Sequence, residues 1–228
     1  RVAAWLVFAL AALTGGPTVA AADPGAGAPA DSSGGDLPAI VARGELRHLG
    51  IRYANFVTGP DGGLDVEVAR RFAEHLGVRY VFVESDWERI IPDLTGHAVV
   101  RDGARARPGA PRPVRGDLIA TGMTRLPWRE DLVAFSQPMF PTQIWLVAPA
   151  RSSLAPITPT DLRHDIAATR GHLDGLRVLA KPNTCLDPAL YDLSGRGAAV
   201  VRFEEPLKFM APAILAGEAE ATILDVPD

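Results

Sequence analysis

The stretch Gly116–Phe140, GDLIATGMTRLPWREDLVAFSQPMF, constrains the fold of this chain more than any other. A short apolar strand, Asp117–Ala120, runs into a turn of small residues, Thr121–Thr124, and Arg129 follows five residues later. A strand that ends in glycine and hydroxyl residues exposes backbone groups at its carboxyl end, where open α/β sheets bind ligands. An arginine just beyond that end can grip a carboxylate through two parallel hydrogen bonds. The stretch therefore predicts a binding site for a molecule that carries a carboxylate.

Composition excludes several other classes of function. The net charge of −4 gives no case for nucleic-acid binding, since such proteins usually concentrate a basic excess. A single cysteine, Cys185, excludes an internal disulfide framework and a cysteine-rich metal site. The five histidines form no pattern typical of zinc ligands, so we expect neither a metal nor a cofactor. With 228 residues, the chain is long enough for one large domain or two lobes of ordinary size.

The N-terminal region reads as an export signal. Val2–Leu13 is an apolar run too short to span a bilayer, and helix-breaking residues and small side chains follow it. We expect residues 1–22 to be a cleaved signal peptide, with an uncleaved membrane anchor as the alternative. Residues 23–36, rich in Gly, Ala, Pro, Ser and Asp, are expected to be a disordered leader.

The remaining chain alternates strands with helices, which favours parallel α/β sheets. Apolar spacing predicts a helix over Leu64–Leu76, with Gly77 as its left-handed stop. A polar, proline-bearing break near Ala148–Pro159 suggests two lobes, 37–148 and 149–228. Helices are further expected over Trp87–Leu94, from the cap Thr160–Asp161 through Thr169, after Asp187–Pro188, and over Pro206–Leu215. Strands are expected at Leu46–Tyr53, Arg79–Glu84, Gln143–Ala148, Leu176–Ala180, Val200–Phe203 and Glu220–Leu224.

Residues 97–115 interrupt this alternation. They hold five arginines, three prolines and two glycines against one aspartate, with no apolar period. We expect an exposed, mobile insertion in the first lobe, and the alternative is a basic docking arm for an acidic partner or a membrane surface.

The spacing M-T-x-x-P-x-R over Met123–Arg129, followed by V-x-F-S-x-P over Val133–Pro138, resembles the signature of the family 3 extracellular solute-binding proteins. These proteins deliver amino acids and similar polar solutes to ABC importers. The resemblance implies a two-lobed, type II periplasmic-binding fold with a ligand cleft, a monomer in the periplasm, and an ABC transporter permease as partner. In that family the chain returns to the first lobe near its end, and this return is expected to be missing after Asp228.

The resemblance also implies roles for individual residues. Arg129 would clamp the α-carboxylate of a zwitterionic ligand with help from Thr124, and Thr121 and Gly122 would offer strand-end backbone groups to its ammonium. Asp225, at the end of the strand A-T-I-L, would receive that ammonium from the other lobe.

Four further candidates are less specific. Tyr53 would stack on the ligand and Trp87 would close the pocket floor, although both could simply fill apolar gaps in the first lobe. Asn183 and Thr184 precede an expected helix, where amides can bind an anion. The family usually has Gly-Thr-Thr at that point, whereas Pro182 here removes an amide donor.

Other functional classes share this fold. The chain could resemble a cyclohexadienyl dehydratase, the front module of a lytic transglycosylase, or the sensor module of a receptor kinase. A dehydratase needs a carboxylic acid placed as a general acid, and the sequence singles out none. The other two need a further catalytic domain or a membrane segment beyond Asp228, so we expect a binding protein and no enzyme.

Overall fold

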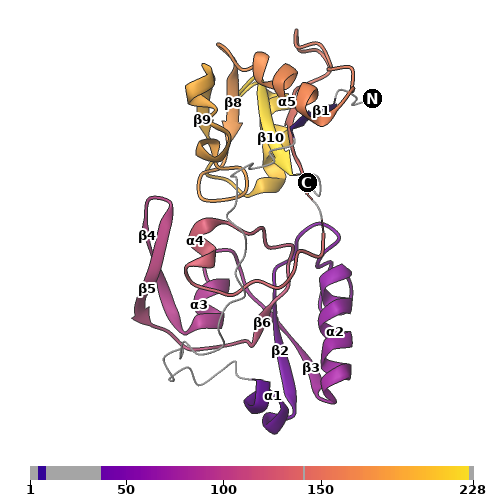
Figure 1. The fold of residues 1–228 in the computed structure, drawn as a ribbon, viewed down its shortest axis with the longest axis vertical. Helices are drawn as coiled ribbons and strands as arrows, with labels where there is room; N and C mark the ends of the chain where they lie inside the picture. The colour runs from indigo at the N-terminus through magenta and orange to yellow at the C-terminus, as the bar shows by residue number, and fades with distance from the viewer. Residues whose placement is uncertain (1–4, 9–36, 141, 226–228) are drawn as a thin grey trace, which may run out of the picture. The chain divides into compact units, whose positions relative to one another are not determined.

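The computed structural model describes residues 5–8, 37–140 and 142–225 and forms two compact units (Figure 1). Unit 1 comprises residues 1–19 and 141–228, and unit 2 comprises residues 20–140. The division falls after Phe140, ahead of the boundary predicted after Ala148. The reason is strand pairing: β7 (Ile144–Val147) is antiparallel to β10 (Ala221–Asp225), which belongs to unit 1. We describe each unit by itself.

Unit 2 is built on a three-stranded parallel sheet in the order β3-β2-β6. Its strands are β2 (Glu45–Gly50), β3 (Arg79–Glu84) and β6 (Leu118–Ile119). Its helices are α1 (Leu37–Arg43), α2 (Leu64–Leu76), α3 (Ile90–Thr95) and α4 (Pro127–Glu130). Helix α2 and strand β3 have the predicted bounds, and Gly77 ends α2 with a φ of 68°, as expected. Local signals sufficed here because the apolar spacing and the glycine stop agree.

The predicted helix over Trp87–Leu94 begins later, at Ile90. Pro92 then lies in the first turn of α3, where its missing N–H leaves no helical hydrogen bond unmade. Ile90 and Ile91 are buried with Leu49 in the main apolar cluster of unit 2. That burial fixes where the short helix can begin.

Most of residues 97–115, expected to form an exposed, mobile insertion, have regular secondary structure. Strands β4 (His97–Asp102) and β5 (Arg105–Pro111) form an antiparallel hairpin, with Asp102 opposite Arg105 (Figure 1). Val99 packs against the apolar cluster that contains Ile90 and Ile91. The hairpin was not predicted because Val99 is the residue of this arginine-rich segment that packs against the cluster, and one such contact produces no apolar period.

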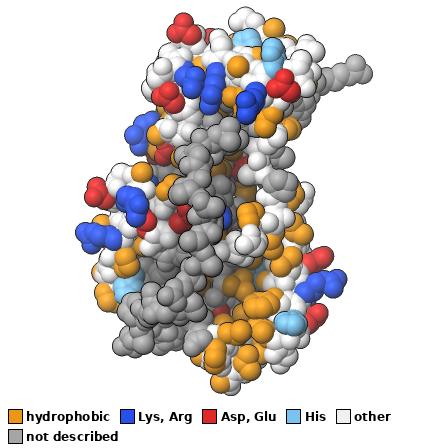
Figure 2. Space-filling model, in the orientation of Figure 1, with side chains coloured by type: hydrophobic (Ala, Val, Ile, Leu, Met, Phe, Trp, Pro, Cys, Tyr) orange, Lys and Arg blue, Asp and Glu red, His pale blue; other side chains and the backbone are white. Residues whose placement is uncertain are grey.

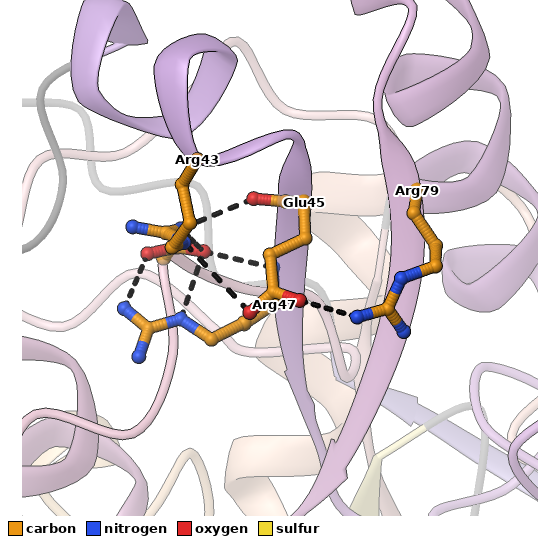
Figure 3. Close-up of polar contacts among 5 residues, drawn as sticks. Arg43, Glu45, Arg47 and Arg79 are labelled. Carbon is orange, nitrogen blue, oxygen red and sulfur yellow. Dashed lines mark hydrogen bonds and ion pairs between the residues drawn. The ribbon is translucent and has the colours of Figure 1, made fainter.

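A buried carboxylate ties together the elements at the amino end of the sheet (Figure 3). Asp117 accepts hydrogen bonds from Arg43 Nη2 at 2.6 Å and from Arg47 Nη2 at 2.8 Å. Its side chain is fully buried, whereas both arginines stay partly exposed. Glu45 pairs with Arg79 at 2.5 Å across the neighbouring strands β2 and β3. Burial alone would raise the pKa of Asp117, but the hydrogen bonds from Arg47 and the charge of Arg43 hold it below its usual range.

Unit 1 contains a five-stranded sheet in the order β1-β7-β10-β8-β9. Strands β10, β8 (Arg177–Ala180) and β9 (Ala199–Arg202) are parallel, and β7 is antiparallel to β10. Asp161 caps α5 (Leu162–Gly171) by accepting from the N–H groups of Arg163 and His164, as predicted. The remaining helical segments are the 3₁₀ turns η1 (Pro188–Tyr191), η2 (Ser194–Arg196) and η3 (Leu207–Phe209), and helix α6 (Met210–Ala216).

Trp5–Phe8, which the sequence analysis assigns to the signal peptide, forms strand β1 along β7. This differs from the expectation that no part of residues 1–22 joins the fold. Without β1, strand β7 would be the edge of the sheet, and its backbone groups on that side would be open for an apolar segment to pair with. The other residues of the expected signal peptide and the leader 23–36 lie outside the described residues. Within the described ranges, no helix has the length and apolar character needed to cross a membrane.

Candidate functional site

Arg129 lies at the end of the one-turn helix α4, where Pro127 occupies the first helical position. The side chain is only 7% exposed. Its Nη1 donates to the carbonyl oxygen of Thr124 at 2.8 Å, and its guanidinium carbon lies 5.1 Å from the ring centre of Trp128 and 5.7 Å from that of Trp87. The structure thus brings three predicted residues together: Thr124 fixes Arg129 through its carbonyl oxygen, and Trp87 lies beside the guanidinium.

The turn after β6 is held to the end of β2 by Thr121. Its buried hydroxyl donates to the carbonyl oxygen of Ile51 at 2.8 Å and accepts from the N–H of Ile51 at 3.0 Å. The hydroxyl therefore extends the β2–β6 pairing by one residue. Any contact of Thr121 with a ligand would have to use its backbone, as the sequence analysis expects.

Asp65, in the first turn of α2, is a residue of this site that sequence reasoning missed. Its Oδ2 accepts from the N–H of Gly122 at 2.6 Å. Burial raises the pKa of Asp65, and the hydrogen bond from Gly122 partly offsets that rise. An ammonium only donates hydrogen bonds, so a ligand's ammonium would use carbonyl oxygens of this turn, while the N–H of Gly122 is engaged by Asp65. An acidic residue in the first turn of a helix was the only sequence signal for Asp65.

Aromatic rings line the same region of unit 2. The ring of Tyr53 stacks on Phe56 at 5.9 Å and meets Trp87 edge-on at 5.8 Å. Phe56 in turn meets Phe140 edge-on at 5.3 Å. Tyr53 is half-buried and Trp87 is 39% exposed, so part of each side chain remains accessible to solvent. Of the two predicted aromatics, Trp87 lies beside Arg129 and Tyr53 contacts Trp87, while Phe56 and Phe140 were not singled out by the sequence.

A buried histidine binds the residue that precedes the turn after β6. His48 on β2 is fully buried, with Nε2 at 2.6 Å from the carbonyl oxygen of Ala120 and Nδ1 at 2.7 Å from the hydroxyl of Tyr80. A carbonyl oxygen can only accept, so Nε2 carries the proton and Nδ1 accepts from Tyr80. Burial lowers the pKa of His48 and raises that of Tyr80 to about 12, so both groups are held neutral.

Asp225 at the end of β10 anchors a separate cluster in unit 1. Its carboxylate accepts from the hydroxyl of Thr142 and from the thiol of Cys185, the latter at 3.7 Å. Asp225 is 6% exposed, and the Tyr191 hydroxyl donates to the backbone carbonyl of Cys185 at 2.5 Å. Burial raises the pKa of Tyr191. The cluster thus places a buried carboxylate beside hydroxyl and thiol groups. Thr142 and Tyr191 were not predicted to belong to it.

Asn183 and Thr184 form a tight turn after β8, and their polar groups serve that turn. The N–H of Asn183, expected to bind an anion, donates to Asp187 Oδ2 at 2.7 Å. The Thr184 hydroxyl donates to the carbonyl of Lys181 and accepts from the N–H of Leu186. The helix expected after Asp187–Pro188 is the 3₁₀ turn η1, four residues long. A neighbouring carboxylate, Asp187, disfavours an anion at this position.

Across residues 5–8, 37–140 and 142–225, no group of three or more histidine, cysteine, aspartate or glutamate side chains is arranged to hold a metal ion.

Comparisons with known proteins give structural neighbours alone, since no protein-family model and no curated protein matches the chain. The arginine-bound form of a truncated ArgBP from T. maritima is 27% identical with a TM-score of 0.55, over 82% of this chain and 76% of that chain. An ancestral amino acid-binding protein, AncCDT-1, described as a precursor of cyclohexadienyl dehydratase, is 25% identical with a TM-score of 0.57, over 84% and 75% of the two chains. These similarities confirm the predicted α/β fold of amino-acid-binding proteins, in agreement with two compact units and parallel-rich sheets.

Proposed function

We propose that this protein is an extracytoplasmic receptor that captures an amino acid and delivers it to an ABC importer, as family 3 solute-binding proteins do. The observation that carries the proposal is the position of Arg129. A buried guanidinium is held by the Thr124 carbonyl beside the rings of Trp87 and Trp128, next to the turn that ends β6. Such a group binds a carboxylate strongly, because few waters compete for it.

Within unit 1, the family resemblance makes Asp225 the candidate acceptor for an ammonium group. This carboxylate is buried beside the small hydroxyl and thiol groups of Thr142 and Cys185, which can re-orient toward a new donor. A buried carboxylate is stabilised by an ammonium group that it can hydrogen-bond. Asn183 and Thr184 keep their role in the turn and carry no part of the proposed binding.

The rings of Tyr53 and Trp87 make cationic amino acids the first candidates. Aromatic faces attract a guanidinium or ammonium group within about 6 Å of the ring centre. The structural neighbour ArgBP is described in its arginine-bound form, which supports arginine as the first ligand to test. The proposal further includes export by the N-terminal signal, a periplasmic location, a monomeric state and delivery to a permease. It includes no catalytic step.

Isothermal titration with arginine, lysine, glutamine and glutamate tests the proposal, using wild-type protein, Arg129→Ala and Arg107→Ala. Arg107 is an exposed arginine of the hairpin and serves as the matched control. A ligand at one hundred times its Kd should stabilise the wild type by about 2.7 kcal/mol in a parallel melting experiment. We expect Arg129→Ala to lose binding and Arg107→Ala to keep it. Equal affinity in wild type and Arg129→Ala would contradict the assignment.

The enzymatic alternative has its own readout. AncCDT-1 is described as a precursor of cyclohexadienyl dehydratase, so arogenate and prephenate belong in the same panel. We expect no turnover of either compound by the wild type. Turnover that is lost in Arg129→Ala would replace the receptor proposal with a dehydratase.

A further inference from the structure

The arginine-rich hairpin β4–β5 lies against helix α4, the element that carries Arg129 (Figure 1). Helix α4 is a single turn of four residues, Pro127–Glu130. So short a helix has no stability of its own, because the cost of forming its first turn is not recovered by later turns. The position of Arg129 therefore depends on what α4 packs against.

Two contacts connect the hairpin to α4. The guanidinium carbon of Arg101, on β4, lies 4.2 Å from the ring centre of Trp128. The same indole lies 5.1 Å from the guanidinium carbon of Arg129. One ring of α4 thus meets a hairpin arginine and the arginine assigned to the ligand, and a shift of either cation changes the surroundings of the other.

The second contact fixes the C-terminal end of α4. Asp131, the residue that ends the helix, is held by both of its carboxylate oxygens. Oδ1 pairs with Arg105 Nη2 at 2.7 Å, and Oδ2 accepts from the backbone N–H of Ala106 at 2.9 Å. The Asp131 side chain is 14% exposed but that of Arg105 is 77% exposed, so solvent weakens the ion pair and the bond from the Ala106 N–H is the better shielded of the two.

We propose that the β4–β5 hairpin is a positioning element that sets the orientation of Arg129, with Arg101 and Asp131 as its positioning residues. Arg101 acts by stacking on Trp128, and Asp131 acts by bonding the end of α4 to β5. The positional claim rests on contacts within unit 2, and only its consequence for affinity rests on the proposed amino-acid binding. The hairpin thereby gains a role that neither a mobile insertion nor a basic docking arm would have.

Two measurements test the positioning without any ligand. The first is amide hydrogen exchange of residues 126–133, where the N–H of Arg129 bonds to Leu126 O at 2.8 Å and that of Val133 bonds to Arg129 O at 2.9 Å. The second is the fluorine NMR signal of Trp128 in protein labelled with 5-fluorotryptophan, assigned by its loss in Trp128→Phe.

The variants are Arg101→Met, Arg101→Lys and Asp131→Asn, with Arg107→Met as the control on the same hairpin. We expect Arg101→Met and Asp131→Asn to speed exchange of the Arg129 and Val133 amides by about fivefold, the effect of losing roughly one contact. Arg101→Met should also shift the Trp128 signal. Arg101→Lys should shift it less, because an ammonium still attracts the ring. Arg107→Met should change neither readout.

Exchange of the β4 and β5 amides in each variant shows whether the hairpin itself remains folded. If Arg101→Met disrupts the hairpin, Asp131→Asn decides the question, since its partners Arg105 and Ala106 remain. Unchanged exchange over residues 126–133 in variants with an intact hairpin would overturn the inference.

Affinity for arginine, measured on the same proteins, separates this inference from the proposed function. If the wild type binds arginine, we expect Arg101→Met and Asp131→Asn to weaken binding by about three- to tenfold, and Arg107→Met to leave it unchanged. If the wild type binds no amino acid, the proposed function fails, while the exchange and fluorine results still decide the positional claim.

Discussion

The backbone N–H of Gly122 donates a hydrogen bond of 2.6 Å to Asp65 Oδ2, which joins the turn after β6 to the first turn of α2. Gly122 has a φ of +62°, a conformation that side chains with a Cβ rarely adopt. A Cβ at this position would lie 2.5 Å from Cδ2 of Phe56. The candidate ligand turn is therefore shaped by a carboxylate on one side and an aromatic ring on the other.

Gly122→Ala should destabilise unit 2 by about 1–3 kcal/mol, because it combines backbone strain with a clash against Phe56. Denaturant unfolding measures the loss. Gly103→Ala is the matched control, since Gly103 has a φ of +58° at the hairpin tip and open space around its Cα. A loss at Gly122 no larger than at Gly103 would mean that Phe56 does not constrain the turn.

Asp65→Asn should change how stability depends on pH. Burial raises the pKa of the Asp65 carboxyl in the folded protein. Its contribution to the free energy of unfolding is therefore largest below the pKa of the unfolded chain, about 3.9, and declines as pH rises through the pKa of the folded protein. The neutral amide removes this decline. We expect the free energy of unfolding to rise more steeply between pH 4 and 7 in Asp65→Asn than in the wild type. Parallel slopes in urea titrations of the two proteins would contradict this.

Asp117→Asn should have the opposite pH signature. Hydrogen bonds from Arg47 and the charge of Arg43 hold the pKa of Asp117 low, so its contribution is present above about pH 3.9 and is lost as pH falls through the folded value. We expect a loss of about 1.5–3 kcal/mol at pH 7, as for hydrogen bonds to charged groups. The two proteins should converge in stability at acid pH, and a constant difference at every pH would refute the ion-pair explanation.

His48→Gln should make the melting temperature less sensitive to acid. Burial lowers the pKa of His48, so the folded protein keeps the ring neutral and loses stability as pH falls below the unfolded value of about 6.5. Glutamine can still donate to the Ala120 carbonyl but does not titrate. The drop in Tm between pH 7 and 5 should shrink in His48→Gln. It should stay unchanged in His75→Gln, the control at an exposed histidine of α2.

Sequence reasoning succeeded where a structure depends on neighbours along the chain. Helix α2 with its Gly77 stop and the Asp161 cap of α5 follow from spacing and side-chain chemistry within a few residues. The motif around Thr124 and Arg129 was found through its resemblance to a family signature, and the bond from Arg129 to the Thr124 carbonyl was not foreseen. Sequence reasoning did not predict the hairpin, helix α4 or the pairing of β7, because each depends on a partner far along the chain.

The sequence by itself determined the α/β class, most strand and helix positions, and Arg129 as the first candidate for a carboxylate ligand. Only the tertiary structure decided that Asp65 holds Gly122 and that Arg101 stacks on Trp128. These partners are separated by tens of residues, and no local propensity encodes which side chain will meet which across a sheet edge. Their meeting follows from burial of the apolar cluster around Leu49, Ile90 and Ile91, which brings distant segments together and leaves their polar groups to pair.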